Sequence, residues 1–108
     1  MKRGEVWTAA GGQAYAGKPR PVVILQDDRF DATDSITVCP LTTDPTSALF
    51  RVPIEPAPGN GLRKRSYVMT DKIVSVPRTR LRDRVGRLGG ADLVGLGRTV
   101  FVFLGLAG

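Results

Sequence analysis

Residues 17–25 read Gly17-Lys18-Pro19-Arg20-Pro21-Val22-Val23-Ile24-Leu25, a cationic pair interleaved with two prolines and followed by four aliphatic residues. A short apolar run that follows turn residues is typical of a buried strand. Each proline fixes its φ at about −65°, so the backbone around Arg20 is held where the strand begins. Because a guanidinium on a rigid backbone suits phosphate recognition, Arg20 is the first candidate functional residue.

The rest of the chain continues the same pattern of short apolar segments between turns rich in Gly, Pro and Asp. This spacing favours a mainly β protein, either a small barrel or a sandwich. Pro40 and Pro53 suggest edge positions or bulges, since proline cannot donate to a ladder. We expect strands at residues 4–9, 20–26, 35–41, 50–54, 66–70 and 84–88, and one short helical turn within 76–81.

Residues 90–107 carry two competing patterns. Leu93, Leu96, Val100 and Phe103 form a helical stripe, whereas residues 100–104 are also a continuous strand-like run. Gly95, Gly97 and Gly105 each weaken a helix by about 1 kcal/mol relative to alanine. We predict a C-terminal helix, because only a packed helix would use the stripe.

The length of 108 residues fits a single domain spanning residues 1–108. No apolar run approaches the roughly 18 residues of a membrane span, and no apolar signal segment follows the N-terminus, so we expect a cytoplasmic protein. The one cysteine, Cys39, lies in a predicted strand and is interpreted as a small buried hydrophobic residue.

Charge is unevenly distributed along the chain. The net charge is +6, and residues 63–87 hold nine basic and two acidic side chains, which is 9 − 2 = +7. Four aspartates, Asp27, Asp28, Asp31 and Asp34, form an acidic loop of opposite sign. A polyanionic partner is one explanation of the basic segment, and a solvated surface that keeps a small protein dissolved is the other.

The chain contains no histidine. This excludes Ser-His triads and His-based metal sites, and a single thiol gives no cysteine metal site. Any acid–base chemistry must therefore use other side chains.

Four ordered segments together resemble the MazF/PemK family of toxin endoribonucleases, the toxic halves of bacterial toxin-antitoxin pairs. They are KRGEVW at residues 2–7, GKPRPVVI at 17–24, VCPLTT at 38–43 and SYVMTDKI at 66–73. The resemblance covers nearly the whole chain. It implies an SH3-like (CcdB/MazF-type) barrel with a C-terminal helix and a homodimer with RNA across the subunit interface. It also implies a MazE-like antitoxin whose C-terminal segment occupies the RNA groove.

The implied activity is sequence-selective, metal-independent cleavage of single-stranded RNA, whether mRNA, tRNA or rRNA, with no cofactor. The products would carry 2′,3′-cyclic phosphate and 5′-hydroxyl ends. Arg20 and Thr42 match the positions taken as catalytic in the family. Arg20 would stabilise charge on the phosphorane as an oxyanion hole does, and Thr42 would hydrogen-bond the same phosphate. Asp71, the acidic residue of the family's strand-end position, would orient or deprotonate the 2′-hydroxyl.

Each of these residues also has a purely structural interpretation. Arg20 can form a surface ion pair with Asp27 or Asp28, and Thr42 can cap the turn that it begins. Asp71 can be the structural partner of Lys72 or Arg20. Arginine itself cannot accept the proton, because its pKa exceeds about 12.

This chain also departs from some relatives. Some carry an arginine two residues before the acid, where this chain has Met69, and some carry a histidine in the first loop. Roles that depend on those two residues are therefore not transferred.

The loop at residues 11–19 is the expected site of base recognition. Tyr15 can stack on an unpaired base and Gln13 can read its edge, whereas a mobile loop without contacts is the alternative. Basic residues, including those at 63–65, fit tracking of the phosphate backbone. The predicted RNA-binding residues are Gln13, Tyr15, Gly17, Lys18, Pro19 and Lys72.

Two other classes of function compete with the enzyme. The same barrel could be a non-catalytic toxin that binds RNA or traps DNA gyrase. A peptide-binding SH3-type module is the third possibility, but seven aromatic residues in all are few for a proline-recognition groove.

Overall fold

The computed structural model describes residues 1–10, 19–45 and 50–106. Its strands are β1 (Glu5–Ala9), β2 (Arg20–Ile24), β3 (Ser35–Thr42), β4 (Arg51–Ile54), β5 (Ser66–Met69), β6 (Val74–Pro77) and β7 (Leu81–Arg87). Within these ranges one α-helix, α1 (Gly90–Phe103), follows the strands, and three 3₁₀ turns lie between strands, η2 (Asp28–Phe30), η3 (Thr70–Lys72) and η4 (Arg78–Arg80).

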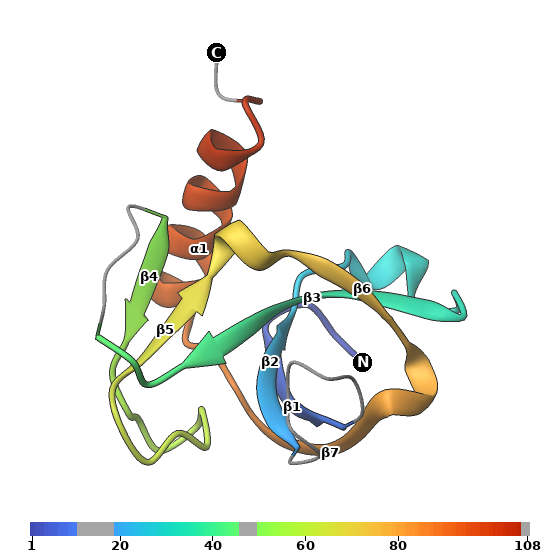
Figure 1. Cartoon of the computed structure of the whole chain (residues 1–108), viewed down its shortest axis with the longest axis horizontal. Coiled ribbons are helices and arrows are strands. Elements are labelled where there is room, and N and C mark those ends of the chain that lie inside the picture. Colours follow the sequence, from blue (N-terminus) through green and yellow to red (C-terminus); the bar gives the residue numbers. More distant parts are fainter. Residues whose placement is uncertain (11–18, 46–49, 107–108) are drawn as a thin grey trace.

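The strands form one antiparallel sheet in the order β4-β5-β3-β2-β1-β7, and β6 pairs with β3 off this path. In Figure 1, β1, β2, β3, β6 and β7 curve around a common interior, and β4 and β5 form a wing beside α1. The expectation of a small barrel with a C-terminal helix is therefore confirmed.

The strand β3 belongs to both parts of the sheet. Val38 is the last residue paired with β6, and Leu41 is the first paired with β5. Pro40 lies in the gap between these two pairings. On that edge of β3 no partner strand needs a hydrogen bond from residue 40, so a proline, which has no N–H, is tolerated there. The change of partner at Pro40 brings the end of β3 between the barrel and the wing.

The apolar run in β2 is buried on both of its faces. Val22 and Ile24 belong to a core cluster inside the barrel, whereas Val23 belongs to a second cluster beneath α1. Successive side chains of a strand point to opposite faces, so a strand between two cores needs an unbroken apolar run. This explains why the segment after Pro21 carries no polar alternation.

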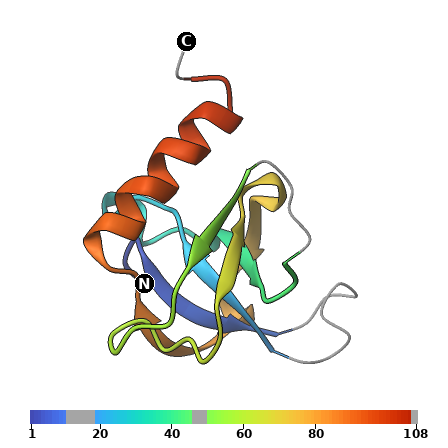
Figure 2. The same ribbon diagram turned by 90° about the vertical axis from the view of Figure 1, so that its left-hand side faces the viewer.

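The helix α1 covers the second cluster with one stripe. Leu96 is fully buried, and Leu93 and Val100 pack against the same cluster. The other end of the helix runs beyond the sheet, as Figure 2 shows. No helix in the described ranges is long and apolar enough to cross a membrane. The predicted helix is confirmed, although Phe103 remains 38% exposed.

Two features of the strand assignment differ from expectation. The strand β6 was not predicted, and β7 begins at Leu81 rather than three residues later. In β6 only Val76 is buried, because the other valine of the strand, Val74, is exposed. The helical turn expected within 76–81 is present as η4, and η2 and η3 are additional turns.

Carboxylates of the acidic loop fasten that loop to its surroundings. Asp27 caps η2 and pairs with Arg29 at 3.1 Å, and Asp28 accepts a backbone N–H at 2.7 Å. Arg78 lies 3.7 Å from Asp31 and also donates to its carbonyl oxygen. These three aspartates therefore have structural partners, which removes two of them as partners of Arg20.

Glu5 is a buried carboxylate at the start of β1. Burial by itself would raise its pKa, but hydrogen-bond donors outweigh that effect and hold the pKa below its usual range. These donors are the backbone N–H of Lys2, the indole of Trp7 and the guanidinium of Arg84, at 2.8 to 3.1 Å. The network joins β1 to β7.

Candidate functional site

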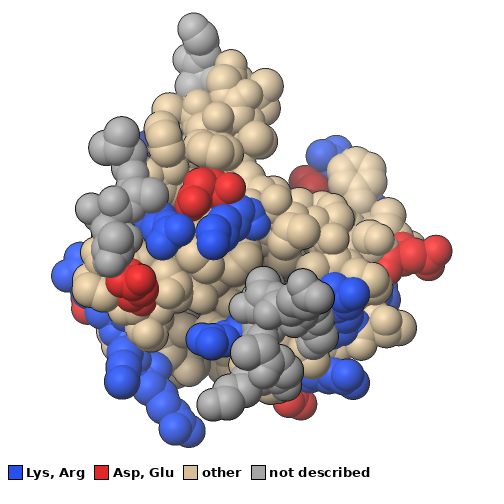
Figure 3. Space-filling model, in the orientation of Figure 1, with Lys and Arg blue, Asp and Glu red and all other residues tan. Residues whose placement is uncertain are grey.

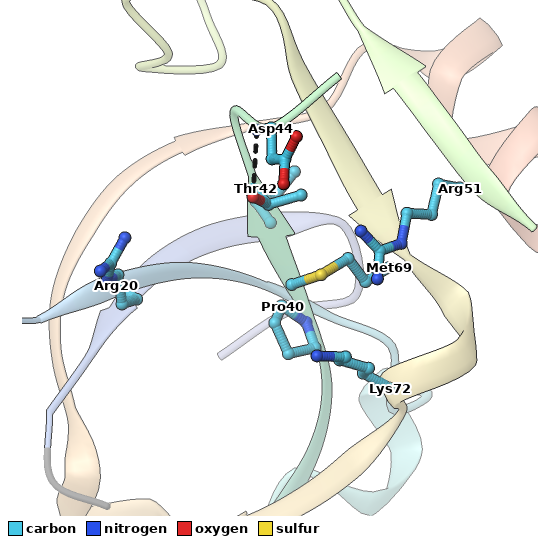
Figure 4. Close-up of a pocket in the computed structure, with 8 residues that line it drawn as sticks. Arg20, Pro40, Thr42, Asp44, Arg51, Met69 and Lys72 are labelled. Carbon is cyan, nitrogen blue, oxygen red and sulfur yellow. Dashed lines mark hydrogen bonds between the residues drawn. The ribbon is translucent and has the colours of Figure 1, made fainter. Parts of the chain in front are cut away.

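A hollow of about 350 Å³ opens where β3 ends, between the barrel and the wing of the sheet. Figure 4 shows its side chains, which come from β2, β3, β4, β5, the turn after β3 and η3. We call this hollow the strand-end pocket. Its lining residues are Arg20, Pro40, Leu41, Thr42, Asp44, Arg51, Met69 and Lys72.

Arg20 is the first residue of β2 and is anchored by its register with Ala9 of β1. Its side chain is exposed at the pocket. Within the described residues it forms no ion pair, and the predicted alternative pairing with Asp27 or Asp28 is wrong. A cation at this position is therefore available to an anionic ligand.

Thr42 is the last residue of β3 and pairs with Tyr67 of β5. Its hydroxyl oxygen accepts the backbone N–H of Asp44 at 3.1 Å, so the predicted turn cap is present (Figure 4). A hydroxyl can accept and donate at the same time. The cap therefore orients the oxygen and leaves its O–H to donate to a ligand.

Asp71 is held by Arg51, a residue that sequence reasoning did not select. The guanidinium contacts both carboxylate oxygens, with Nε–Oδ1 and Nη2–Oδ2 distances of 3.4 Å. The expected structural partner of Asp71 was Lys72 or Arg20, and Arg51 takes that place. Asp71 does not line the pocket, whereas Arg51 does.

Arg51 lies directly opposite Met69 in the register of β4 and β5. In Figure 4 the two side chains lie next to each other on the same side of the pocket. The sequence signal that could have identified Arg51 is a basic residue near the start of the strand predicted at residues 50–54. Its opposite residue depends on register, which the local sequence does not state.

Three cationic side chains, Arg20, Arg51 and Lys72, surround the pocket, and Asp44 is the acidic residue in its lining. Basic side chains are spread over the face that Figure 3 displays, with acidic ones between them. Pro19 is exposed beside Arg20 but is not part of the lining. The other predicted base-recognition residues, Gln13, Tyr15, Gly17 and Lys18, lie outside the described residues.

Cys39 is completely buried. Burial, with a smaller contribution from the charge of Asp71, raises the pKa of its thiol to about 12. The thiol therefore stays protonated and unreactive, which confirms the expected structural role. Over the ranges that the structure describes, no group of three or more Cys, Asp or Glu side chains could hold a metal ion.

The chemistry of the pocket suits a phosphodiester. Two guanidinium forks and an ammonium offer charge and donors to non-bridging oxygens, and a hydroxyl offers one more donor. Both guanidinium groups come from strands, so their positions are fixed by the sheet rather than by loops.

Comparison with known proteins adds independent information. A family model described as PemK-like, MazF-like toxin of type II toxin-antitoxin system matches residues 2–103. A protein of Mycolicibacterium smegmatis (strain ATCC 700084 / mc(2)155), described as a probable endoribonuclease MazF, is 56% identical over 109 aligned residues that cover 100% of both chains.

Solved structures resemble the fold over nearly the whole chain. The Mycobacterium tuberculosis toxin MazF-mt6 has a TM-score of 0.79 at 25% identity, covering 94% of this chain and 97% of its own. An endoribonuclease from mycobacterial species, solved in complex with its cognate antitoxin, has a TM-score of 0.83 at 23% identity. That match covers 98% of this chain and 96% of the other, and at this identity it supports the fold alone.

Proposed function

The chain belongs to the family of PemK-like and MazF-like toxins of type II toxin-antitoxin systems, and from this premise we propose that it is an endoribonuclease that cuts single-stranded RNA at specific sequences. The proposed reaction needs no metal ion. The strand-end pocket holds the scissile phosphate, and the substrate supplies the nucleophile.

In this reaction the 2′-oxygen of the ribose attacks the adjacent phosphorus. A 2′-O–P bond forms, the P–O5′ bond breaks, and the products are a 2′,3′-cyclic phosphate and a 5′-hydroxyl. One group must take the proton of the 2′-hydroxyl, and the leaving 5′-oxygen must gain one. Negative charge builds on the non-bridging oxygens of the phosphorane, so the protein must also supply positive charge there.

The observation that carries the proposal is that Arg20 and Thr42 line the same pocket. Arg20 is exposed at the first residue of β2 and has no ion-pair partner in the described part of the chain. Thr42 ends β3 in the same pocket with its oxygen oriented by the N–H of Asp44. We assign Arg20 to charge stabilisation of the phosphorane and Thr42 to a hydrogen bond on the same phosphate.

Arg51 supplies a second cation to the phosphate. Some relatives carry an arginine at the position of Met69, and Arg51 is the residue opposite Met69 across the strand pair. In this chain the cation of this strand pair is Arg51, on β4. Asp71 pairs with the Arg51 guanidinium from outside the pocket lining, so we assign Asp71 to positioning that guanidinium.

The carboxylate best placed to take the proton of the 2′-hydroxyl is that of Asp44. It belongs to the pocket lining, whereas Asp71 does not. A general base must reach the proton that it removes, which geometry decides before pKa. Asp44 therefore replaces Asp71 as the proposed base.

Homodimerisation and an antitoxin partner complete the proposal. Apolar side chains on the end of α1 are about half exposed, with Phe101 at 51%, Val102 at 55% and Leu104 at 53%. A second copy of the chain would cover them, with RNA running across the interface and a MazE-like antitoxin competing for the same groove. Cytoplasmic RNA, whether mRNA, tRNA or rRNA, is the substrate class.

Incubation of the purified protein with a mixed-sequence RNA in EDTA tests the function. We expect discrete fragments that disappear with Arg20→Ala and diminish strongly with Thr42→Val, while Thr42→Ser retains cleavage. Intact RNA after incubation with the wild type, or fragments unaffected by Arg20→Ala, would contradict the proposal. RNA binding without new ends, or trapped gyrase on DNA, would indicate a non-catalytic toxin instead.

A further inference from the structure

A second hollow, of about 300 Å³, lies beside the strand-end pocket, between the loop that joins β4 to β5 and the strands β1, β2 and β7. We call it the flank groove. It is mainly apolar, with Pro21, Leu62 and Val85 among its lining, and it has Arg63 and Lys64 at its border.

The flank groove and the strand-end pocket share a rim made of two consecutive residue pairs. Arg20 and Thr42 line the pocket, while the next residues, Pro21 and Thr43, line the groove. Neighbouring residues of an extended chain point to opposite sides, so the two hollows lie on either side of the same strand ends. A strand of RNA that leaves the pocket can therefore reach the groove by passing over these strand ends.

The loop that carries the basic residues is built onto β7. Asn60 is 1% exposed, and its side chain makes three hydrogen bonds of 2.9 to 3.1 Å to the backbone of the same loop. Gly61 has φ +71°, and a Cβ there would lie 2.2 Å from the carbonyl oxygen of Val85. Such close backbone contact fixes the loop, so Arg63 and Lys64 stand on a rigid support.

The charges at the groove are available to a ligand. Within the described residues the side chains of Arg63 and Lys64 make no ion pair, whereas the adjacent Arg65 pairs with Glu55 at 3.0 Å and lies over the ring of Tyr67. Figure 3 shows basic side chains at the lower left, where the β4–β5 loop lies in Figure 1. An apolar floor beside unpaired cations fits a nucleotide, with its base or ribose on the floor and its phosphate at the border.

We propose that the flank groove binds a nucleotide on one side of the scissile phosphate. Arg63 and Lys64 contact its phosphates, and Pro21, Leu62 and Val85 lie against its base or ribose. This subsite rests on the proposed function, since it extends the RNA path from the strand-end pocket. It makes the length of RNA on that side a determinant of affinity.

Binding of short RNAs tests the subsite. The probes are fluorescein-labelled RNAs that contain the site cut by the wild type, carry 2′-deoxyribose at the scissile position, and extend by different lengths on either side. For Arg63→Ala/Lys64→Ala we expect about five- to thirty-fold weaker binding of probes extended on one side, and no difference once that side is trimmed. The slope of log K against log salt should fall by about 2 × 0.7 = 1.4.

The control is Lys2→Ala/Arg29→Ala, which removes the same charge at exposed residues outside both hollows. If the control variant weakens RNA binding as much as Arg63→Ala/Lys64→Ala does, the effect is one of net charge and the subsite is overturned. The subsite is also overturned if Arg63→Ala/Lys64→Ala weakens the binding of trimmed and extended probes equally. Loss of antitoxin binding with RNA binding intact would assign the groove to the antitoxin instead. If no cut site is found, a mixed-sequence RNA of graded lengths replaces the probes, so failure of the proposed nuclease activity is scored separately.

Discussion

Arg51 on β4 contacts both carboxylate oxygens of Asp71 on η3, with two N–O distances of 3.4 Å. The Arg51 side chain is 16% exposed and lines the strand-end pocket, while Asp71 lies outside that lining. The ion pair with Asp71 fixes the orientation of the Arg51 guanidinium at the pocket. A fixed guanidinium favours the binding of an anionic ligand there. This pair connects the wing of the sheet to the proposed chemistry.

The first prediction concerns that pair. Arg51→Ala should lower kcat/KM for RNA by about ten- to hundred-fold, the contribution of one hydrogen bond to a charged group. Arg51→Lys should recover only part of this loss, because lysine keeps the charge but not the fork. Arg29→Ala, from the exposed Arg29–Asp27 pair, is the matched control and should leave kcat/KM unchanged. Full activity of Arg51→Ala would remove this residue from the site.

The second prediction separates the two carboxylates. Asp44→Asn should lower kcat by roughly 10²-fold or more and abolish the acidic limb of the pH–rate profile, as loss of a general base does. Asp71→Asn should lower kcat less and keep that limb, since it acts through Arg51. Thermal melting of both variants checks that they fold. A larger loss for Asp71→Asn, with the limb lost, would return the base to Asp71.

The third prediction concerns stability in acid. Burial alone would raise the pKa of Glu5, but hydrogen bonds and Arg84 hold its folded-state pKa below its usual range. The carboxylate therefore contributes stability above its unfolded-state pKa, and the contribution is lost as pH falls through the folded-state pKa. Glu5→Gln should be less stable than the wild type at about pH 7, and should lose less stability between about pH 7 and pH 3. Urea denaturation at both pH values measures this, and parallel losses in the two proteins would contradict it.

The fourth prediction concerns assembly. Phe101→Asp/Leu104→Asp should shift the protein from dimer to monomer and reduce RNA cleavage, because burial of an unpaired charge in an apolar interface has a large free-energy cost. Phe30→Asp is the control, since Phe30 is 56% exposed on another part of the molecule and Phe101 is 51% exposed. Sedimentation velocity measures the state. A monomeric wild type, or a dimer that survives both substitutions, would contradict this interface.

Local sequence pattern predicted the parts of the fold that depend on local chemistry. The unbroken run Val22–Ile24 indicated burial before its two cores were known, and both Arg20 and Thr42 stand at strand ends that meet in one pocket. The strand β6 escaped prediction because it buries one residue along the edge of β3.

The site was less predictable, because its members meet through register. Arg51 reaches the pocket from β4 because it is paired with Met69, and Asp44 enters the lining because β3 extends to Thr42. Neither relationship can be read from neighbouring residues in the sequence. From the sequence, Lys72 or Arg20 is the expected structural partner of Asp71, whereas the structure places Arg51 there.

The most direct test of the nuclease mechanism is sequencing of 5′-hydroxyl RNA ends produced in EDTA by the wild type, Arg20→Lys and Arg20→Ala. We predict that the wild type generates such ends at one recurrent sequence motif and that Arg20→Ala lowers their yield by roughly 10² to 10³. Arg20→Lys should give an intermediate yield at the same motif. Ends that carry 5′-phosphate, cleavage that requires added metal, or equal yields from Arg20→Ala and the wild type would contradict the mechanism.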